Sequence, residues 1–223
     1  MKNKEIVKLQ TEPAPLEIDL ERFALMVIDM QNAFVSKGGM FDLWGFDVSH
    51  IPNVIKPIEK LIGASREKGV KIIYLAHTLS PGAQEVGPMT RFWHSRTLRA
   101  YRERPEMADS LLTKGTWGAE IIDQLKPRDD DILIEKRRFS GFVGTDLDLL
   151  LRSFDIRYLA LTGVATNICV ESTLRDAFHL EYHPVLISDA AAASPASRQE
   201  STIANVIQCF GWVATTEQLL HVL

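Results

Sequence analysis

The chain has 223 residues, 46% hydrophobic and 24% charged, which is enough to build one sizeable core. Its formal net charge of −4 gives no electrostatic footprint for nucleic acid, and no apolar run approaches a membrane span or a signal peptide. The two cysteines, Cys169 and Cys209, form no disulfide framework and favour a reducing cytoplasm.

Short apolar runs alternate with helical patterns along the chain. The apolar runs predict strands at residues 24–30, 70–77, 131–136, 156–164 and 184–188. Helical spacing predicts helices at 54–68, at 145–154, from about 169 to 178 and at 197–209, and the last twelve residues predict a short strand and a final helix. Continuous apolar strands separated by helices indicate an α/β fold with a parallel sheet covered on both faces. With no repeat and no clear linker, residues 1–223 are expected to form a single domain.

Polar residues interrupt the predicted strands where the strands end. Asp29 ends the first strand, His77 the second and Lys136 the third, and the turn 165–169 follows the fourth. Parallel sheets place their ligand sites beyond the carboxyl ends of the strands. We therefore expect one site at this edge.

Cys169 lies in the first turn of the helix that follows the fourth predicted strand. The unpaired N–H groups and the positive dipole end of that helix favour a thiolate, which is the nucleophilic form. The alternative is that Cys169 is a small buried hydrophobic residue.

Asp29 and Lys136 are the other reactive groups of the predicted site. An ammonium at Lys136 would hold a carboxylate and a thiolate in their charged forms, and Asp29 could act as general base for the thiol. Alternatively, Asp29 caps a helix that starts at Gln31 or Asn32. Lys136 could equally be a solvated residue at a strand end.

The turn between the fourth strand and the Cys169 helix contains small residues. Backbone N–H groups of Ala165 and Cys169 are candidates for an oxyanion hole. Thr166 or Asn167 is expected to cap the helix.

Three motifs carry a family resemblance: DMQNAF from Asp29, KRRFSGF from Lys136 and GVATNICVESTLRDAF around Cys169. In this order and spacing they resemble the isochorismatase-like cysteine hydrolases, from about residue 24 to 220. The resemblance implies a three-layer α/β/α sandwich on a mainly parallel, doubly wound sheet, with residues 1 to about 20 as an N-terminal extension. It also implies a catalytic triad of Asp29, Lys136 and Cys169, a cis peptide between Val164 and Ala165, and a homodimer or homotetramer.

Within this group, residues 38–49 and 114–125 resemble the ureidoacrylate amidohydrolases more than the biuret or N-carbamoylsarcosine hydrolases. The resemblance implies cleavage of the C–N bond of a small ureido or amide substrate through a covalent acyl-enzyme, with release of ammonia or carbamate. A biuret or triuret hydrolase with the same triad is the alternative enzyme. A catalytically silent binding protein on the same fold is the alternative from another class.

The sequence departs from the zinc-binding members of the superfamily. Those proteins hold zinc through an Asp-x-His pair, and the corresponding run here is Leu75-Ala76-His77. One histidine does not hold zinc, so we expect neither metal nor cofactor.

Substrate-binding candidates follow from position. Phe34 and Phe139 lie just past Asp29 and Lys136, where they either sandwich a planar ureido group or pack in the core. His77 either bonds substrate or is structural, and Gln208 is expected to reach the site from the late helix.

Other residues are expected to lie away from the chemistry. Three arginines are placed on a solvated helix face unless one of them binds a substrate carboxylate: Arg91, Arg96 and Arg99. Cys209 is expected in the core, and Trp93 and Trp117 are candidate contacts between subunits.

Overall fold

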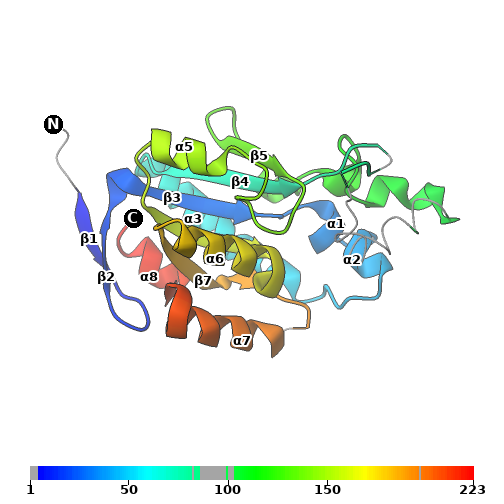
Figure 1. Ribbon diagram of the computed structural model, residues 1–223. Helices are drawn as coiled ribbons and strands as arrows, with labels where there is room; N and C mark the ends of the chain where they lie inside the picture. Colours follow the sequence, from blue (N-terminus) through cyan, green and yellow to red (C-terminus); the bar gives the residue numbers. More distant parts are fainter. Residues whose placement is uncertain (1–4, 82, 86–98, 100–102, 196) are drawn as a thin grey trace.

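Six parallel strands form the central sheet, in the order β5-β4-β3-β6-β7-β8 (Figure 1). The computed structural model describes residues 5–81, 83–85, 99, 103–195 and 197–223. The strands are β3 (Phe23–Ile28), β4 (Lys71–His77), β5 (Ile132–Lys136), β6 (Tyr158–Val164), β7 (His183–Ala192) and β8 (Trp212–Ala214). Each lies at a predicted position, and all their pairings are parallel.

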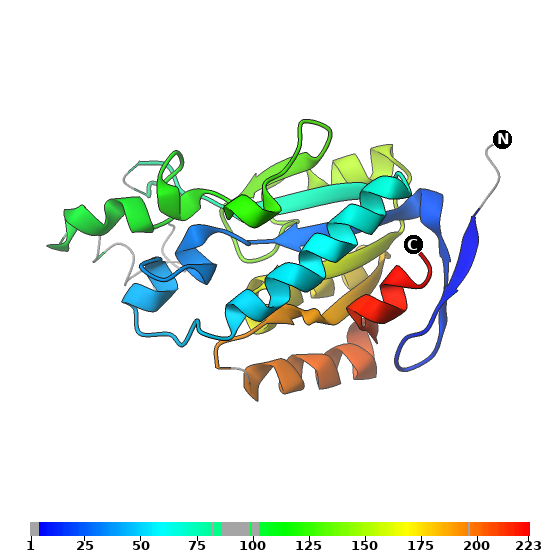
Figure 2. The same cartoon turned by 180° about the vertical axis from the view of Figure 1, so that it is seen from behind.

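Helices cover both faces of this sheet, which confirms the predicted three-layer α/β/α fold. The helices on one face are α5 (Leu147–Ser153), α6 (Glu171–His179) and α7 (Ser197–Asn205), as Figure 1 shows. On the other face lie α3 (Ile55–Glu67) and α8 (Thr216–Leu220), as Figure 2 shows. Two short helices, α1 (Asn32–Val35) and α2 (Met40–Leu43), follow β3.

Strand β3 shows why the central strands are apolar without interruption. All six of its residues are buried. Leu25 and Val27 pack in the core shared with α3, whereas Met26 and Ile28 pack in the core shared with α5 and α6. Because successive side chains point to opposite faces, a strand covered on both sides needs apolar residues at every position.

The predicted N-terminal extension forms a separate antiparallel hairpin of β1 (Ile6–Leu9) and β2 (Leu16–Asp19). Glu12, in the hairpin turn, exchanges two backbone hydrogen bonds with Val213 of β8. Among the helices in the described part of the chain, none is both long and apolar enough to cross a membrane.

A glycine allows β6 to approach β3 closely. Gly163 has a φ of +104°, and a Cβ built there would lie 2.0 Å from the carbonyl oxygen of Ile28. We predict that Gly163→Ala lowers the free energy of unfolding by about 2 kcal/mol or more, because a rigid backbone must shift. Urea denaturation measures this. Gly63→Ala is the control, because a Cβ at this position of α3 meets no atom within 4 Å and should stabilise the helix by about 0.5–1 kcal/mol. Equal effects of the two substitutions would contradict the prediction.

Candidate active site

The carboxyl ends of neighbouring strands bring three reactive side chains together. Asp29 follows β3, Lys136 is the last residue of β5, and Cys169 lies in the turn after β6. One carboxylate oxygen of Asp29, one ring nitrogen of His77 and the Sγ of Cys169 all lie within 4.8 Å of one another. The sheet edge predicted from sequence is therefore where these groups meet.

Lys136 and Asp29 form a buried ion pair. The Lys136 Nζ lies 2.8 Å from Asp29 Oδ2, and the two side chains are 0% and 1% exposed. The lysine is thus not a solvated strand end. Asp29 does not cap α1 either, because the N-cap position of that helix is Gln31.

Burial and mutual attraction set the charges of this pair. Burial opposes the charged form of Lys136, but Asp29 and Cys169 together outweigh it, and the pKa of Lys136 is raised. Burial raises the pKa of Asp29 above its usual value, although Lys136 acts in the opposite direction. A carboxylate with a raised pKa is a stronger base than an ordinary aspartate.

Cys169 is a buried thiol in the resting protein, not the thiolate expected from its place at a helix start. Burial raises its pKa well above the usual range, and Asp29 raises it further, while Lys136 lowers it. The first turn, Thr166–Val170, is a wide π-type turn, and the α-helix itself begins only at Glu171. Deprotonation of this thiol therefore requires a base, and Asp29 is beside it.

The turn before Cys169 has the predicted backbone form. The peptide bond between Val164 and Ala165 is cis, as the family resemblance implied. The expected cap by Thr166 or Asn167 is wrong, because the N-cap residue of the turn is Ala165. Thr166 instead donates a hydrogen bond to the side-chain oxygen of Gln199 in α7 at 3.1 Å.

Aromatic side chains surround His77, the last residue of β4. The rings of Phe34 and Phe139 have centroids 6.4 and 6.5 Å from that of His77. Phe34 is also 4.9 Å from Phe41, in an edge-to-face contact. The structure thus brings three predicted substrate-binding residues to one place near the ion pair, where they also pack against one another.

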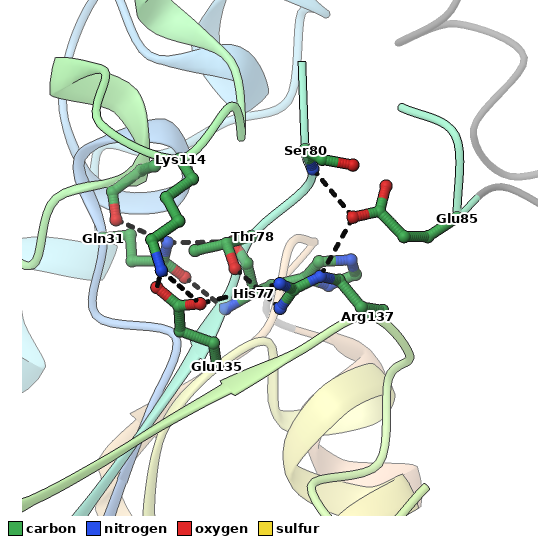
Figure 3. A network of polar contacts seen from close by, with 9 residues as sticks. Gln31, His77, Thr78, Ser80, Glu85, Lys114, Glu135 and Arg137 are labelled. Carbon is green, nitrogen blue, oxygen red and sulfur yellow. Dashed lines mark hydrogen bonds and ion pairs between the residues drawn. The ribbon is translucent and has the colours of Figure 1, made fainter. Parts of the chain in front are cut away.

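Gln31, which was not among the residues predicted from sequence, joins the ends of three segments. Its fully buried amide accepts a hydrogen bond from the His77 N–H at 2.8 Å. It also donates to the carbonyl oxygens of His77 at 2.9 Å and Ala119 at 2.7 Å. Figure 3 shows Gln31 beside His77. The signal was a polar residue two positions after Asp29, where the chain is still buried.

Thr173 is a second missed residue. Its hydroxyl donates to the carbonyl oxygen of Cys169 at 2.7 Å and accepts from the N–H of Gly141 at 3.0 Å. The hydroxyl therefore ties the Cys169 turn to the loop that follows Lys136.

A polar network lies beside the site, next to β4 and β5 (Figure 3). Arg137 contacts the carboxylates of Glu85 at 3.3 Å and Glu135 at 3.6 Å. Glu135 also pairs with Lys114 at 2.9 Å. Partial burial raises the pKa of Glu85, but bonds from Ser80 and Arg137 outweigh this and lower it to about 2. Glu85 is thus a permanent anion at neutral pH.

Gln208 is not at this edge, which corrects its predicted role. It is exposed and lines a surface groove with His183 and Trp212, the first residues of β7 and β8. Strand starts and strand ends lie at opposite edges of a parallel sheet, so Gln208 is far from the cysteine.

The remaining predictions divide between the described and the undescribed residues. Cys209 is exposed rather than part of the core. Arg99 is solvated as expected, with its side chain 75% exposed and paired with Glu103. Trp117 is 37% exposed. Arg91, Trp93 and Arg96 lie outside the residues that the structure describes.

The doubly wound sheet, with a buried thiol, carboxylate and ammonium at its carboxyl edge, defines a three-layer α/β/α protein with a cysteine-containing site. The isochorismatase domain model matches residues 23–218. The chain belongs to the isochorismatase family.

Relatives narrow the activity. A ureidoacrylate amidohydrolase RutB of Stutzerimonas stutzeri is 45% identical over 96% of this chain and 87% of its own length. Another, of Agrobacterium fabrum, is 44% identical over 96% of each chain. Because these relatives match nearly the whole chain, the protein is a hydrolase that acts on C–N bonds.

Solved structures agree with the fold. A cysteine hydrolase of Pseudomonas syringae pv. phaseolicola 1448A superposes with a TM-score of 0.81, at 27% identity over 100% of this chain and 98% of the other. An N-carbamoylsarcosine amidase of Thermoplasma acidophilum gives a TM-score of 0.67, at 26% identity over 88% of this chain and 97% of the other.

Proposed function

We propose that the protein is a metal-independent cysteine amidohydrolase of small ureido acids of the ureidoacrylate type. The observation that carries the proposal is the buried group of Asp29, Lys136 and Cys169, one thiol with one base and one cation. The similarity to ureidoacrylate amidohydrolases supports the substrate class.

The first half of the reaction forms the acyl-enzyme. Asp29 takes the proton of the Cys169 thiol as the sulfur attacks the ureido carbonyl carbon. Lys136 stabilises the developing thiolate, in line with its lowering effect on the thiol pKa. The N–H groups of Ala165 and Cys169 are proposed to hold the oxyanion. Asp29 then returns the proton to the departing nitrogen, the C–N bond breaks, and a thiocarbamate remains on the sulfur.

The second half hydrolyses this intermediate. Asp29, again ionised, takes a proton from water, and the oxygen attacks the acyl carbon. The C–S bond breaks, the proton returns to the sulfur, and the product leaves as carbamate. Carbamate decomposes to ammonia and carbon dioxide.

The pH dependence follows from the pKa of Asp29. The base must be ionised, so kcat/KM is present above this pKa and is lost as the pH falls through it. Because burial raises the pKa of Asp29, we predict the midpoint of the acid limb above 3.8. The pH profile of kcat/KM over a range where the protein remains folded measures it. A limb at or below 3.8 would contradict the assignment of the base.

Chelators should leave the activity unchanged. Asp29, His77 and Cys169 together resemble a metal-binding set. However, the ammonium of Lys136 already binds one carboxylate oxygen, and the thiol is protonated. A dication would have to displace both the ammonium and the thiol proton. We predict less than a twofold loss of rate after dialysis against EDTA. A loss that zinc restores would overturn metal independence.

A substrate panel tests the function itself. Ureidoacrylate, biuret, triuret and N-carbamoylsarcosine are each incubated with the enzyme, and substrate loss is followed by chromatography. We expect the highest kcat/KM for ureidoacrylate. Higher values for biuret would favour the alternative enzyme, and no turnover of any compound would favour a binding protein.

Assembly and location complete the proposal. We propose a homodimer or homotetramer, which light scattering after size-exclusion chromatography measures. A cytoplasmic location suits the two free thiols, Cys169 and Cys209, which would remain reduced there.

A further inference from the structure

Arg138 lies next to the buried ion pair and directs its charge toward no described carboxylate. Its backbone carbonyl accepts a hydrogen bond from the Lys136 Nζ at 3.2 Å. Its guanidinium donates to the carbonyl oxygens of Arg137 at 2.8 Å and Glu85 at 3.2 Å. Both partners are neutral backbone groups. Within the described residues, no Asp or Glu oxygen lies within ion-pair distance of Arg138.

The neighbouring cations are already neutralised. Lys136 is paired with Asp29. Arg137 is held between Glu85 and Glu135 in the network of Figure 3, where Lys114 supplies a second positive charge. The charges of these two groups therefore cancel, and Arg138 leaves one positive charge beside the site.

The position of Arg138 suits a substrate with an anionic end. It is two residues past Lys136 and immediately before Phe139, whose ring is near His77. Its guanidinium has five N–H donors, and the two bonds to carbonyls leave donors over. Those two bonds also restrain the side chain, so binding a carboxylate costs little further ordering.

We propose that Arg138 binds the carboxylate of the substrate and thereby selects ureido acids over neutral ureido compounds. The inference rests on the proposed function and deepens it by assigning the group that recognises the acid end. A guanidinium recognises a carboxylate through paired, charge-assisted hydrogen bonds, which an uncharged ester cannot match. Of the three arginines that are candidates for this role from their place in the sequence, Arg91, Arg96 and Arg99, the last is paired with Glu103 instead.

The test compares ureidoacrylate with its methyl ester, which lacks the negative charge and carries one more methyl group; loss of the ureido group is followed by chromatography. For Arg138→Gln we expect kcat/KM for ureidoacrylate to fall about 100-fold, mainly through KM, and that for the ester to change less than threefold. Arg138→Lys keeps the charge but lacks the planar guanidinium. Its kcat/KM for ureidoacrylate should lie between those of the wild type and Arg138→Gln.

Arg137→Gln is the matched control, the same substitution one residue earlier in a cation that already has carboxylate partners. It should change kcat/KM for both substrates by the same factor. Thermal melting of each variant establishes that it is folded.

Two results overturn the assignment. If Arg138→Gln lowers kcat/KM equally for both substrates, or for neither of them, the carboxylate is bound elsewhere. If the wild type turns over neither compound, the proposed function fails and the role of Arg138 fails with it. Selective loss of the anionic substrate in Arg138→Gln but not in Arg137→Gln supports the proposal.

Discussion

Replacing Cys169 by serine or alanine should abolish turnover and leave the protein folded. The mechanism requires a thiol that transfers its proton to Asp29 and whose sulfur then forms a covalent acyl-enzyme. A serine hydroxyl beside the same base is a much weaker acid than the thiol, and alanine offers no nucleophile. We expect kcat to fall by at least about 1,000-fold in both variants, as measured by substrate loss under saturating ureidoacrylate.

The fold should tolerate these substitutions because a backbone contact holds residue 169 in place beside the side-chain bonds that Cys169 makes with Asp29 and Lys136. The Thr173 hydroxyl bonds the residue 169 carbonyl whatever the side chain is. Cys209→Ser is the matched control, since this thiol is free and exposed on another part of the surface, and it should retain wild-type activity. Retention of more than about a tenth of the rate in Cys169→Ala would exclude covalent catalysis by this residue.

The positions of the strands along the chain and the location of the site could be predicted because both depend on a local pattern. Apolar runs such as 24–28 and 158–164 are buried on both faces, and that requirement is visible residue by residue. Polar residues that end such runs, Asp29 after 24–28 and Lys136 at the end of 132–136, then mark the carboxyl edge. One rule of α/β folds connected them.

The charge state of Cys169 could not be predicted from sequence. Position at a helix start argues for a thiolate, but the degree of burial and the closeness of Asp29 decide the pKa, and both depend on tertiary packing. Lys136 illustrates the same limit. Its neighbours Arg137 and Arg138 suggest a surface run, although Lys136 itself is fully buried.

Long-range connections account for the remaining misses. Gln31 acts on backbone groups of residues 77 and 119, far away in the chain, and no spacing rule points to them. The predicted role of Gln208 was wrong because a polar residue in a late helix carries no information about which end of the sheet it faces.

Asp29→Asn should inactivate the enzyme and also destabilise it strongly. Asparagine has nearly the same shape but cannot accept the thiol proton, so kcat should fall at least about 1,000-fold. It also leaves the Lys136 ammonium, 0% exposed, without its carboxylate. Breaking one partner of a buried pair costs about 3–5 kcal/mol. Urea denaturation at pH 7 measures this loss of stability.

The double variant Asp29→Asn/Lys136→Met separates stability from catalysis. Methionine is a long apolar side chain without a charge to desolvate, so the double variant should recover most of the stability lost in Asp29→Asn. It should remain inactive, because both the base and the cation are gone. Recovery of activity together with stability would show that the pair acts only in folding.

The pH dependence of stability tests whether Lys136 carries a buried charge that Asp29 stabilises. In the wild type the carboxylate raises the pKa of Lys136, so its stabilising charge is present below the unfolded pKa and is lost only as pH rises through the folded one. In the Asp29→Asn variant, Lys136 is buried but no longer has a carboxylate beside it. Its pKa should therefore fall below the value in the unfolded chain. The unfolded chain then binds more protons, so the variant should gain stability relative to wild type as the pH rises from 7 toward 10. A deficit that does not change with pH, or an Asp29→Asn protein within about 1 kcal/mol of wild type at pH 7, would mean that Lys136 carries no buried charge that depends on Asp29.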